Sequence, residues 1–293
     1  MIFALLAILS FALQNLCCKE FGRRFPGTVP VQAAMIAVST LIVTALMAAL
    51  GGARPLAAGE WGIAAAFGLW FVITMASMTL AMRYGPMGVT VLIQNASLIV
   101  PTLYSVLFRH ERFTAAKAVG AACILVMLAL SALGDASAAD DAARRQWDRR
   151  KWVLFTALAF IGDSVLSILQ GSMADSAADS VTFTFWTSLF SMGFALALLA
   201  ATLRGSGALP ALRGRAGTFG LCCAGIGAGT AGGNCMSIVA LTCLPGIVLF
   251  PLRQGGLVLL MWVVGAVVYR EKVSRSGWLM LLFGLAGLVL LNL

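Results

Sequence analysis

Long apolar runs, bounded by charged residues, glycine or proline, follow one another along this chain and predict ten membrane-spanning helices. A run of about twenty apolar residues matches the thickness of the hydrocarbon core of a bilayer. The predicted segments are residues 2–20, 29–50, 59–82, 86–108, 114–133, 152–173, 180–203, 216–242, 245–268 and 275–292. The pattern therefore predicts an all-α integral membrane protein.

Composition supports lipid as the solvent, because 61% of the residues are hydrophobic and only 11% are charged. Soluble domains carry about a quarter charged residues. The formal net charge of +9 would suggest nucleic acid as a partner of a soluble protein, but most Lys and Arg residues lie between the apolar segments and act as topology signals. The seven cysteines all fall inside apolar stretches without the spacing of metal ligands, which favours a role in helix packing.

An internal repeat is indicated by the polar stretch at residues 134–151, which divides the chain nearly in half. A shift of 160 positions aligns residues 76–133 with 236–293 without a gap. It superposes Gln94 on Gln254, Glu111 on Glu271 and Leu133 on Leu293. Identity is sparse, so the alternative is a coincidence of short loops between apolar helices.

A weaker match, shifted by 149 positions, places Gln14 on Asp163. The predicted organisation is a first five-helix repeat over residues 1–133, a charged linker at 134–151 and a second five-helix repeat over 152–293. Because five is an odd number, the second repeat must cross the membrane in the opposite sense. Inverted repeats of this kind occur in many secondary transporters, where the substrate binds near the midplane between the halves.

The sequence segments at the end of each half resemble those of a known protein family. FRHERFTAAKAVGAACILVMLAL from Phe108 and VVYREKVSRSGWLMLLFGLAGLVLL from Val267 each contain a charged turn with Glu, followed by a short final helix that contains glycine. In these features, and in its length, its ten segments and its duplication, the chain resembles the EamA-type transporters of the drug/metabolite transporter superfamily. The resemblance implies a monomeric bundle with a central cavity, and substrates ranging from amino acids and nucleotide sugars to drugs and lipid-linked sugars.

Charge and resemblance predict opposite orientations in the membrane. Four Lys and Arg residues lie in loops that follow even-numbered segments (Arg54, Arg109, Arg112 and Lys117), whereas 15 lie in loops that follow odd-numbered segments. The positive-inside rule therefore favours both termini outside. The resemblance implies both termini in the cytoplasm.

Two ionisable residues lie inside apolar segments, where a charge costs about 2.5–3.5 kcal/mol on insertion scales. Arg253 lies near the middle of the ninth segment and Asp163 near the middle of the sixth. Arg253 would bind a carboxylate or phosphate of a substrate through its planar fork. Asp163 would bind a substrate amine or couple transport to protons. Alternatively, the two residues pair with each other and hold the halves together.

Further candidates for substrate binding are polar or aromatic residues within the apolar segments. Pro251, followed by Gly255 and Gly256, would weaken the ninth helix and free backbone groups beside Arg253, or would produce only a kink. The polar candidates are Gln254, Gln94, Asn95, Asn234, Gln14 and Asn15, with helix–helix hydrogen bonding as the alternative. Trp70 and Trp186 are candidates for stacking on a ligand, with simple packing as the alternative.

The function predicted from the sequence is secondary active transport of a small anionic or zwitterionic metabolite by alternating access. The alternatives are an exporter of cationic or quaternary-amine compounds and a flippase of a lipid-linked sugar. We expect no enzymatic activity, because no convergent catalytic set of residues occurs, and no cofactor or metal. The expected partners are the substrate and the lipid bilayer, with protons as a further partner if transport is coupled to them. Nucleic acid is not expected as a partner. The expected location is the bacterial inner membrane. We expect a multi-pass protein that is a monomer.

Overall fold

All the regular secondary structure in the described part of the chain is helical. The computed structural model describes residues 1–25, 28–84, 90, 93–109, 114–136, 148–174, 179–203, 214–267 and 275–291. The helices of the first half are α1 (Ile2–Arg24), α2 (Val29–Ala49), α3 (Glu60–Tyr84), the 3-10 helix η1 (Ala96–Leu98), α5 (Ile99–Phe108) and α6 (Ala115–Ala136). Those of the second half are α8 (Arg149–Ala174), α9 (Ser180–Leu203), α11 (Ala216–Cys243), α12 (Gly246–Val267) and α13 (Arg275–Leu291).

Six of the described helices are long and apolar enough to cross a membrane: α1, α2, α3, α8, α9 and α11. Three shorter apolar stretches, residues 93–108, 115–130 and 246–261, lie in the remaining helices. Each of the ten predicted segments overlaps described helix, and most boundaries agree within a few residues. The chain is therefore a helical protein with several membrane-spanning segments.

The distribution of side chains is that of a protein surrounded by lipid. On α1, Leu5, Leu9 and Leu13 follow one face and are 54%, 56% and 45% exposed. Serine and threonine, by contrast, are frequent among the buried side chains, including Thr74, which is 0% exposed. The apolar face of the helix is directed outwards and the interior holds the hydroxyl groups, which is the arrangement that a bilayer allows.

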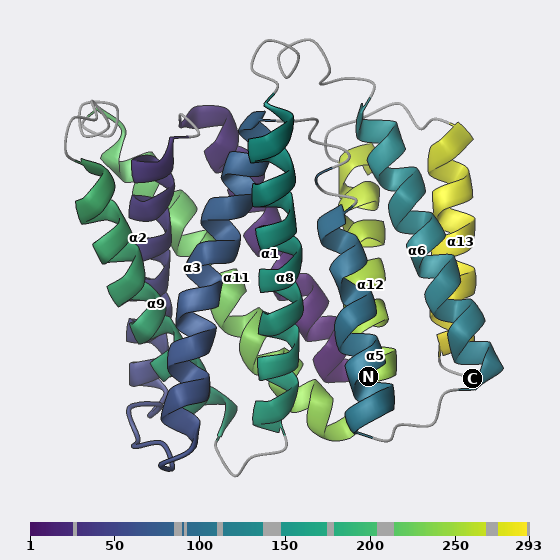
Figure 1. Ribbon diagram of the computed structural model, residues 1–293, viewed down its shortest axis with the longest axis horizontal. Helices are drawn as coiled ribbons and strands as arrows, with labels where there is room; N and C mark the ends of the chain where they lie inside the picture. Colours follow the sequence, from purple (N-terminus) through teal and green to yellow (C-terminus); the bar gives the residue numbers. More distant parts are fainter. Residues whose placement is uncertain are drawn as a thin grey trace.

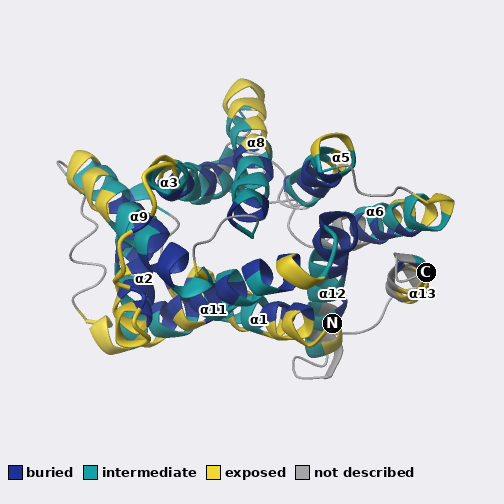
Figure 2. Ribbon diagram, turned by 90° about the horizontal axis from the view of Figure 1, so that it is seen from below, coloured by how far each residue is buried: buried dark blue, intermediate teal, exposed yellow. Residues whose placement is uncertain are grey.

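The helices pack as pairs that combine distant parts of the chain. Helix α1 packs along α11, α3 along α8, α2 along α9 and α6 along α13. Seen from below, α2, α11, α1 and α12 follow one side and α9, α3, α8 and α5 the other, with α6 and α13 together at one end (Figure 2). Helix α1 begins and α13 ends at the same end of the bundle (Figure 1). The interior is thus formed jointly by the two halves.

Helix ends follow ordinary rules of sequence. Pro30 occupies the first turn of α2, and Gly51, with a φ of 83°, reverses the chain after that helix. Asp148 precedes α8 and accepts a hydrogen bond from the backbone N–H of Lys151 at 3.3 Å, which is the geometry of an N-cap. Its carboxylate also contacts the Lys151 ammonium at 3.1 Å, and these bonds lower the pKa of Asp148 below its ordinary value.

Glycines of α11 allow a very close contact with α1. A Cβ on Gly229 would lie 2.6 Å from the carbonyl oxygen of Ser10, and one on Gly233 would lie 2.6 Å from the ring of Phe11. Atoms in proteins do not approach a Cβ this closely, so the two helices can meet here only because the side chains are absent. The glycine-rich segment therefore serves helix packing, which is a common use of small residues in membranes.

The expected interruption of the ninth segment does not occur. Helix α12 is continuous from Gly246 to Val267 and contains Pro251 within it. The irregular backbone lies instead in the fourth segment, where the 3-10 helix η1 directly precedes α5. Membrane helices tolerate proline when neighbouring groups and small local adjustments compensate for the lost backbone hydrogen bond.

Candidate functional site

Arg253 extends from α12 towards α8 and is bound there by neutral groups. Its Nη1 donates a hydrogen bond to Oε1 of Gln170 at 2.8 Å, and its Nη2 lies 3.5 Å from Oγ of Ser167. The guanidinium carbon lies 5.5 Å from the ring centre of Phe11 and 5.9 Å from that of Phe250. The side chain is partly exposed. A guanidinium has five N–H donors, so these contacts leave donors for a further acceptor.

Asp163 lies on α8, on the same face as Ser167 and Gln170, because residues four and seven positions apart follow one side of a helix. Its Oδ2 accepts a hydrogen bond from the hydroxyl of Ser97 in η1 at 2.5 Å. Among the ion pairs of the described residues, none joins Asp163 to Arg253. The interior therefore contains two ionisable side chains of opposite type, and the hydrogen-bond partners of each among the described residues are neutral. The prediction of a direct pair is not supported.

A directed chain of hydrogen bonds leads from Arg253 to Asn234 in α11. Since Arg253 can only donate, Gln170 must accept through Oε1, and its Nε2 donates to Oδ1 of Asn234 at 3.1 Å. The amide nitrogen of Asn234 then remains available to donate a hydrogen bond. The permanent charge of Arg253 thereby orients two amides across three helices.

Gln254, the neighbour of Arg253, bonds across the halves of the chain. Its Nε2 donates to Oδ1 of Asn95 at 2.5 Å, which connects α12 to the residue just before η1. Gln94 lies beside Asn95, and its buried Oε1 has no hydrogen-bond partner in the described part of the protein. A buried amide oxygen without a partner costs free energy and is a ready acceptor for a ligand or water.

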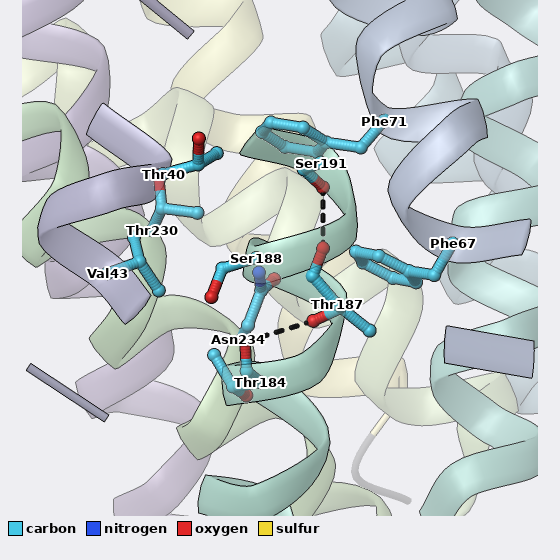
Figure 3. A pocket seen from close by; sticks show the side chains of 10 residues that line it. All are labelled: Thr40, Val43, Phe67, Phe71, Thr184, Thr187, Ser188, Ser191, Thr230 and Asn234. Carbon is cyan, nitrogen blue, oxygen red and sulfur yellow. Dashed lines mark hydrogen bonds between the residues drawn. The ribbon is translucent and has the colours of Figure 1, made fainter. Parts of the chain in front are cut away.

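A small pocket, with a cavity volume of about 10 Å³, lies between α2, α3, α9 and α11. Its wall is rich in hydroxyl groups, and Val43, Phe67, Phe71 and Asn234 complete it (Figure 3). The hydroxyls come from Thr40, Thr184, Thr187, Ser188, Ser191 and Thr230. Asn234 lines the pocket and also receives the hydrogen bond from Gln170, so it joins the pocket to the environment of Arg253.

The other predicted residues lie away from this network. Gln14 faces the close contact with Gly229, whereas Asn15 is exposed and donates to the carbonyl of Phe11 in its own helix at 2.8 Å. Trp70 packs near Gly162 of α8. Trp186 donates from its indole to the carbonyl of Arg54 at 2.7 Å. Neither tryptophan lines the pocket between α2, α3, α9 and α11.

The structure adds residues that the sequence analysis did not single out. Gln170 and Ser167 are the hydrogen-bond partners of Arg253, and Gln170 is only 3% exposed. A signal for both was present, since they lie four and seven positions after Asp163 on one helical face. The aromatic wall of the pocket consists of Phe67 and Phe71 rather than of tryptophans.

The fold and this polar interior define a multi-pass helical membrane protein with charged side chains held among its helices. In the part of the chain that the structure describes, no group of three His, Cys, Asp or Glu side chains is arranged to hold a metal ion.

Comparison with known proteins supports the fold and leaves the function open. No protein-family model matches the sequence, and no curated protein matches it. One solved crystal structure, described only as that of a protein, is similar with a TM-score of 0.74 and 15% sequence identity, covering 100% of this chain and 97% of the other. At this identity the likeness concerns the fold alone, and it extends over the whole chain.

Proposed function

We propose that the protein is a secondary transporter of the EamA-type drug/metabolite class, which moves a small zwitterionic or anionic metabolite across the membrane by alternating access. The observation that carries this proposal is that Arg253 and Asp163 lie in the interior without an ion pair between them. Among the described residues, the hydrogen-bond partners of both side chains are neutral. Charges in a membrane interior are costly, and where they occur they commonly mark the path of a substrate or ion.

The packing of the helices favours two inverted five-helix repeats. If α1, α2, α3, α5 and α6 correspond to α8, α9, α11, α12 and α13, the pair α1–α11 corresponds to the pair α8–α3. The contact of α3 with α9 likewise corresponds to that of α11 with α2, while α2–α9 and α6–α13 correspond to themselves. A two-fold axis would produce this pattern, and inverted repeats allow the halves to rock around a central site.

Arg253 suits the anionic group of a substrate. Its present partners, Gln170 and Ser167, are neutral, and a carboxylate would form stronger, charge-assisted bonds with the same guanidinium. The rings of Phe11 and Phe250 lie beside the charge, with their centres 5.5 and 5.9 Å from the guanidinium carbon. An anion that takes the proton of Nη1 would release Oε1 of Gln170 and so change the hydrogen bonds between α8, α11 and α12.

Asp163 would allow the protein to bind a zwitterion, because its carboxylate suits the cationic group of such a substrate. Among the described residues, the side chain of Ser97 alone donates to this carboxylate, and an ammonium group would neutralise it. A proton carried on Asp163 would serve the same purpose and would couple transport to a proton gradient. Export of a cationic compound is the second candidate, favoured by Asp163 but opposed by the nearby positive charge of Arg253.

The proposal is tested by thermal unfolding of the purified protein with amino acids, organic acids, phosphorylated sugars and quaternary amines. We expect a zwitterion or anion to raise the unfolding temperature of the wild type but not of Arg253→Met. Loss of a charge-assisted hydrogen bond costs about 1.5–3 kcal/mol, which weakens binding by about ten- to a hundredfold. Arg54→Met, which alters an exposed loop arginine, is the control and keeps the wild-type response.

Two further measurements make the result unambiguous. Arg253→Lys keeps the charge but loses the planar fork, so it should bind the same compound more weakly if Arg253→Met is too unstable to measure. Counterflow of the radiolabelled compound into proteoliposomes then tests transport itself. Equal stabilisation of the wild type and Arg253→Met, or stabilisation only by cations, contradicts the proposed role of Arg253.

A further inference from the structure

The hydroxyl-lined pocket between α2, α3, α9 and α11 is suited to a small ligand. Its cavity volume is about 10 Å³, room for about one water-sized group, and lies far below the ~300–1,000 Å³ typical of pockets for drug-sized molecules. It lies outside the direct contacts of Arg253 and Asp163 and is joined to Arg253 through Asn234 and Gln170. The chemistry of its wall can therefore be considered by itself.

The hydroxyl groups of the pocket direct their protons away from it. Thr187, Ser191 and Thr230 donate to carbonyl oxygens three or four residues earlier in their own helices, at 3.1, 2.7 and 2.7 Å. Thr40 and Ser188 do the same at 2.7 and 2.9 Å. Figure 3 shows two of these bonds along α9. Each oxygen still has lone pairs once its single proton is engaged.

Two of the lining residues differ from these five. The thiol of Cys235 donates to Oγ1 of Thr184 at 3.3 Å, which leaves the hydroxyl proton of Thr184 to donate. Asn234 accepts from Gln170 through its oxygen, and its amide nitrogen remains to donate. The pocket thus has five hydroxyl oxygens with lone pairs and two donors, and the rings of Phe67 and Phe71 also line it.

We propose that this pocket binds a monovalent cationic group, held by the lone pairs of the hydroxyl oxygens and faced by Phe67 and Phe71. An anion would meet lone pairs on almost every side. A divalent cation is disfavoured because no lining residue is a carboxylate, the usual ligand of calcium and magnesium. An apolar ligand larger than about one water-sized group does not fit the cavity volume of about 10 Å³. Oxygen ligands and aromatic faces suit both an alkali-metal ion and an ammonium group.

The test is cation-dependent stabilisation of the purified protein at constant ionic strength. The unfolding temperature is measured in the chlorides of sodium, potassium, ammonium, methylammonium and the bulky cation N-methyl-D-glucamine as reference. We expect at least one small cation to raise it above the reference. Thr187→Val removes one oxygen with little change of shape, so the Kd for that cation should rise about tenfold or more.

Two matched variants separate loss of the ligand oxygen from general damage to the helix. Thr202→Val removes a hydroxyl that donates to Leu198 in the same helix at 2.7 Å but lies outside the pocket, so it should retain the response. Thr187→Ser keeps the oxygen and should also retain it. A response to sodium or potassium identifies an inorganic ion, and one confined to ammonium compounds identifies an amine. The proposal is overturned if no small cation exceeds the reference or if Thr187→Val responds as the wild type does.

This inference goes beyond the proposed function, because it concerns binding alone. A cation response that persists in Arg253→Met supports the pocket even if no anionic substrate is found. Conversely, loss of the cation response leaves the test of Arg253 with metabolites intact.

Discussion

At the scale of single residues, the amide of Gln170 connects the two parts of the polar interior. It accepts from Arg253 at 2.8 Å and donates to Asn234 at 3.1 Å, while being 3% exposed. An amide offers an acceptor and two donors on the same rigid plane without carrying a charge. The orientation of Asn234, and with it the donor end of the pocket, thus depends on this residue.

We predict that Gln170→Met destabilises the protein by about 1–3 kcal/mol, because both Arg253 and Asn234 lose a partner within the bundle. The measurement is the unfolding temperature in detergent, with Ser172→Ala as the control in the same helix. Ser172 donates only to the carbonyl of Ile168, at 3.1 Å. An equal decrease in both variants would show that Gln170 has no special importance.

Arg253, Asp163 and Asn234 were predicted from the sequence, whereas Ser167, Gln170 and the hydroxyl groups of the pocket were not. Arg253 and Asp163 are conspicuous because a charge inside an apolar run is rare. Ser167, Gln170 and the hydroxyls of the pocket resemble the many polar residues that merely bond within or between membrane helices. Only the packing of α2, α3, α9 and α11 shows which of them share a pocket.

At the scale of elements, the contact between α1 and α11 is the most demanding packing in the bundle. It brings the backbone of α1 against glycines on one face of α11, with Ser10 and Phe11 filling the space. A carbonyl oxygen cannot move aside without a shift of its helix. Any added carbon atom must therefore separate the two helices.

We predict that Gly229→Ala lowers the unfolding free energy by about 1–3 kcal/mol, the usual cost of overpacking a tight contact. Gly220→Ala in the same helix is the control, since no atom lies within 4 Å of a Cβ there. Because alanine favours helix more than glycine does, the control should be neutral or slightly stabilising. Similar losses in both variants would argue against close packing as the reason for the glycines.

Helix positions were predictable because long apolar runs leave little choice in a bilayer, and α9 spans the predicted residues 180–203. The positions at which the helical backbone becomes irregular were not predictable. Pro251 and two glycines suggested a break in α12, yet the helix is continuous, and the irregular turn lies at Ala96–Leu98. Neighbouring helices decide whether a proline interrupts a membrane helix, and single-segment patterns contain no information about neighbours.

At the scale of the whole molecule, the basic residues gather at one end of the bundle. The end at which α1 terminates and α8 and α11 begin carries Arg23, Arg24, Arg149, Arg150, Lys151 and Arg215 (Figure 1). The opposite end, where α1 begins, carries Arg54, Arg109 and Lys117 in the described part of the chain. The positive-inside rule therefore predicts that the first of these ends faces the cytoplasm.

We predict that Gly59→Cys is labelled by a membrane-impermeant maleimide in intact cells and that Gly214→Cys is labelled only after permeabilisation. Both variants are made in a background without the native cysteines. The two glycines lie in loops at opposite ends, and a Cβ at either position meets no atom within 4 Å, so neither change disturbs packing. The reverse pattern would mean that both termini lie in the cytoplasm, as the family resemblance implies.

Trp186 is placed where its intrinsic fluorescence would respond to a movement at one end of the bundle. Its ring lies 4.5 Å from that of Trp61, centre to centre, and its indole N–H is bonded to the carbonyl of Arg54 in the loop between α2 and α3. It is also two positions from Thr184, on the pocket wall of the same helix. Indole emission depends on the polarity and hydrogen bonding around the ring. A movement that opens this end of the bundle would therefore change the intrinsic fluorescence without any attached dye.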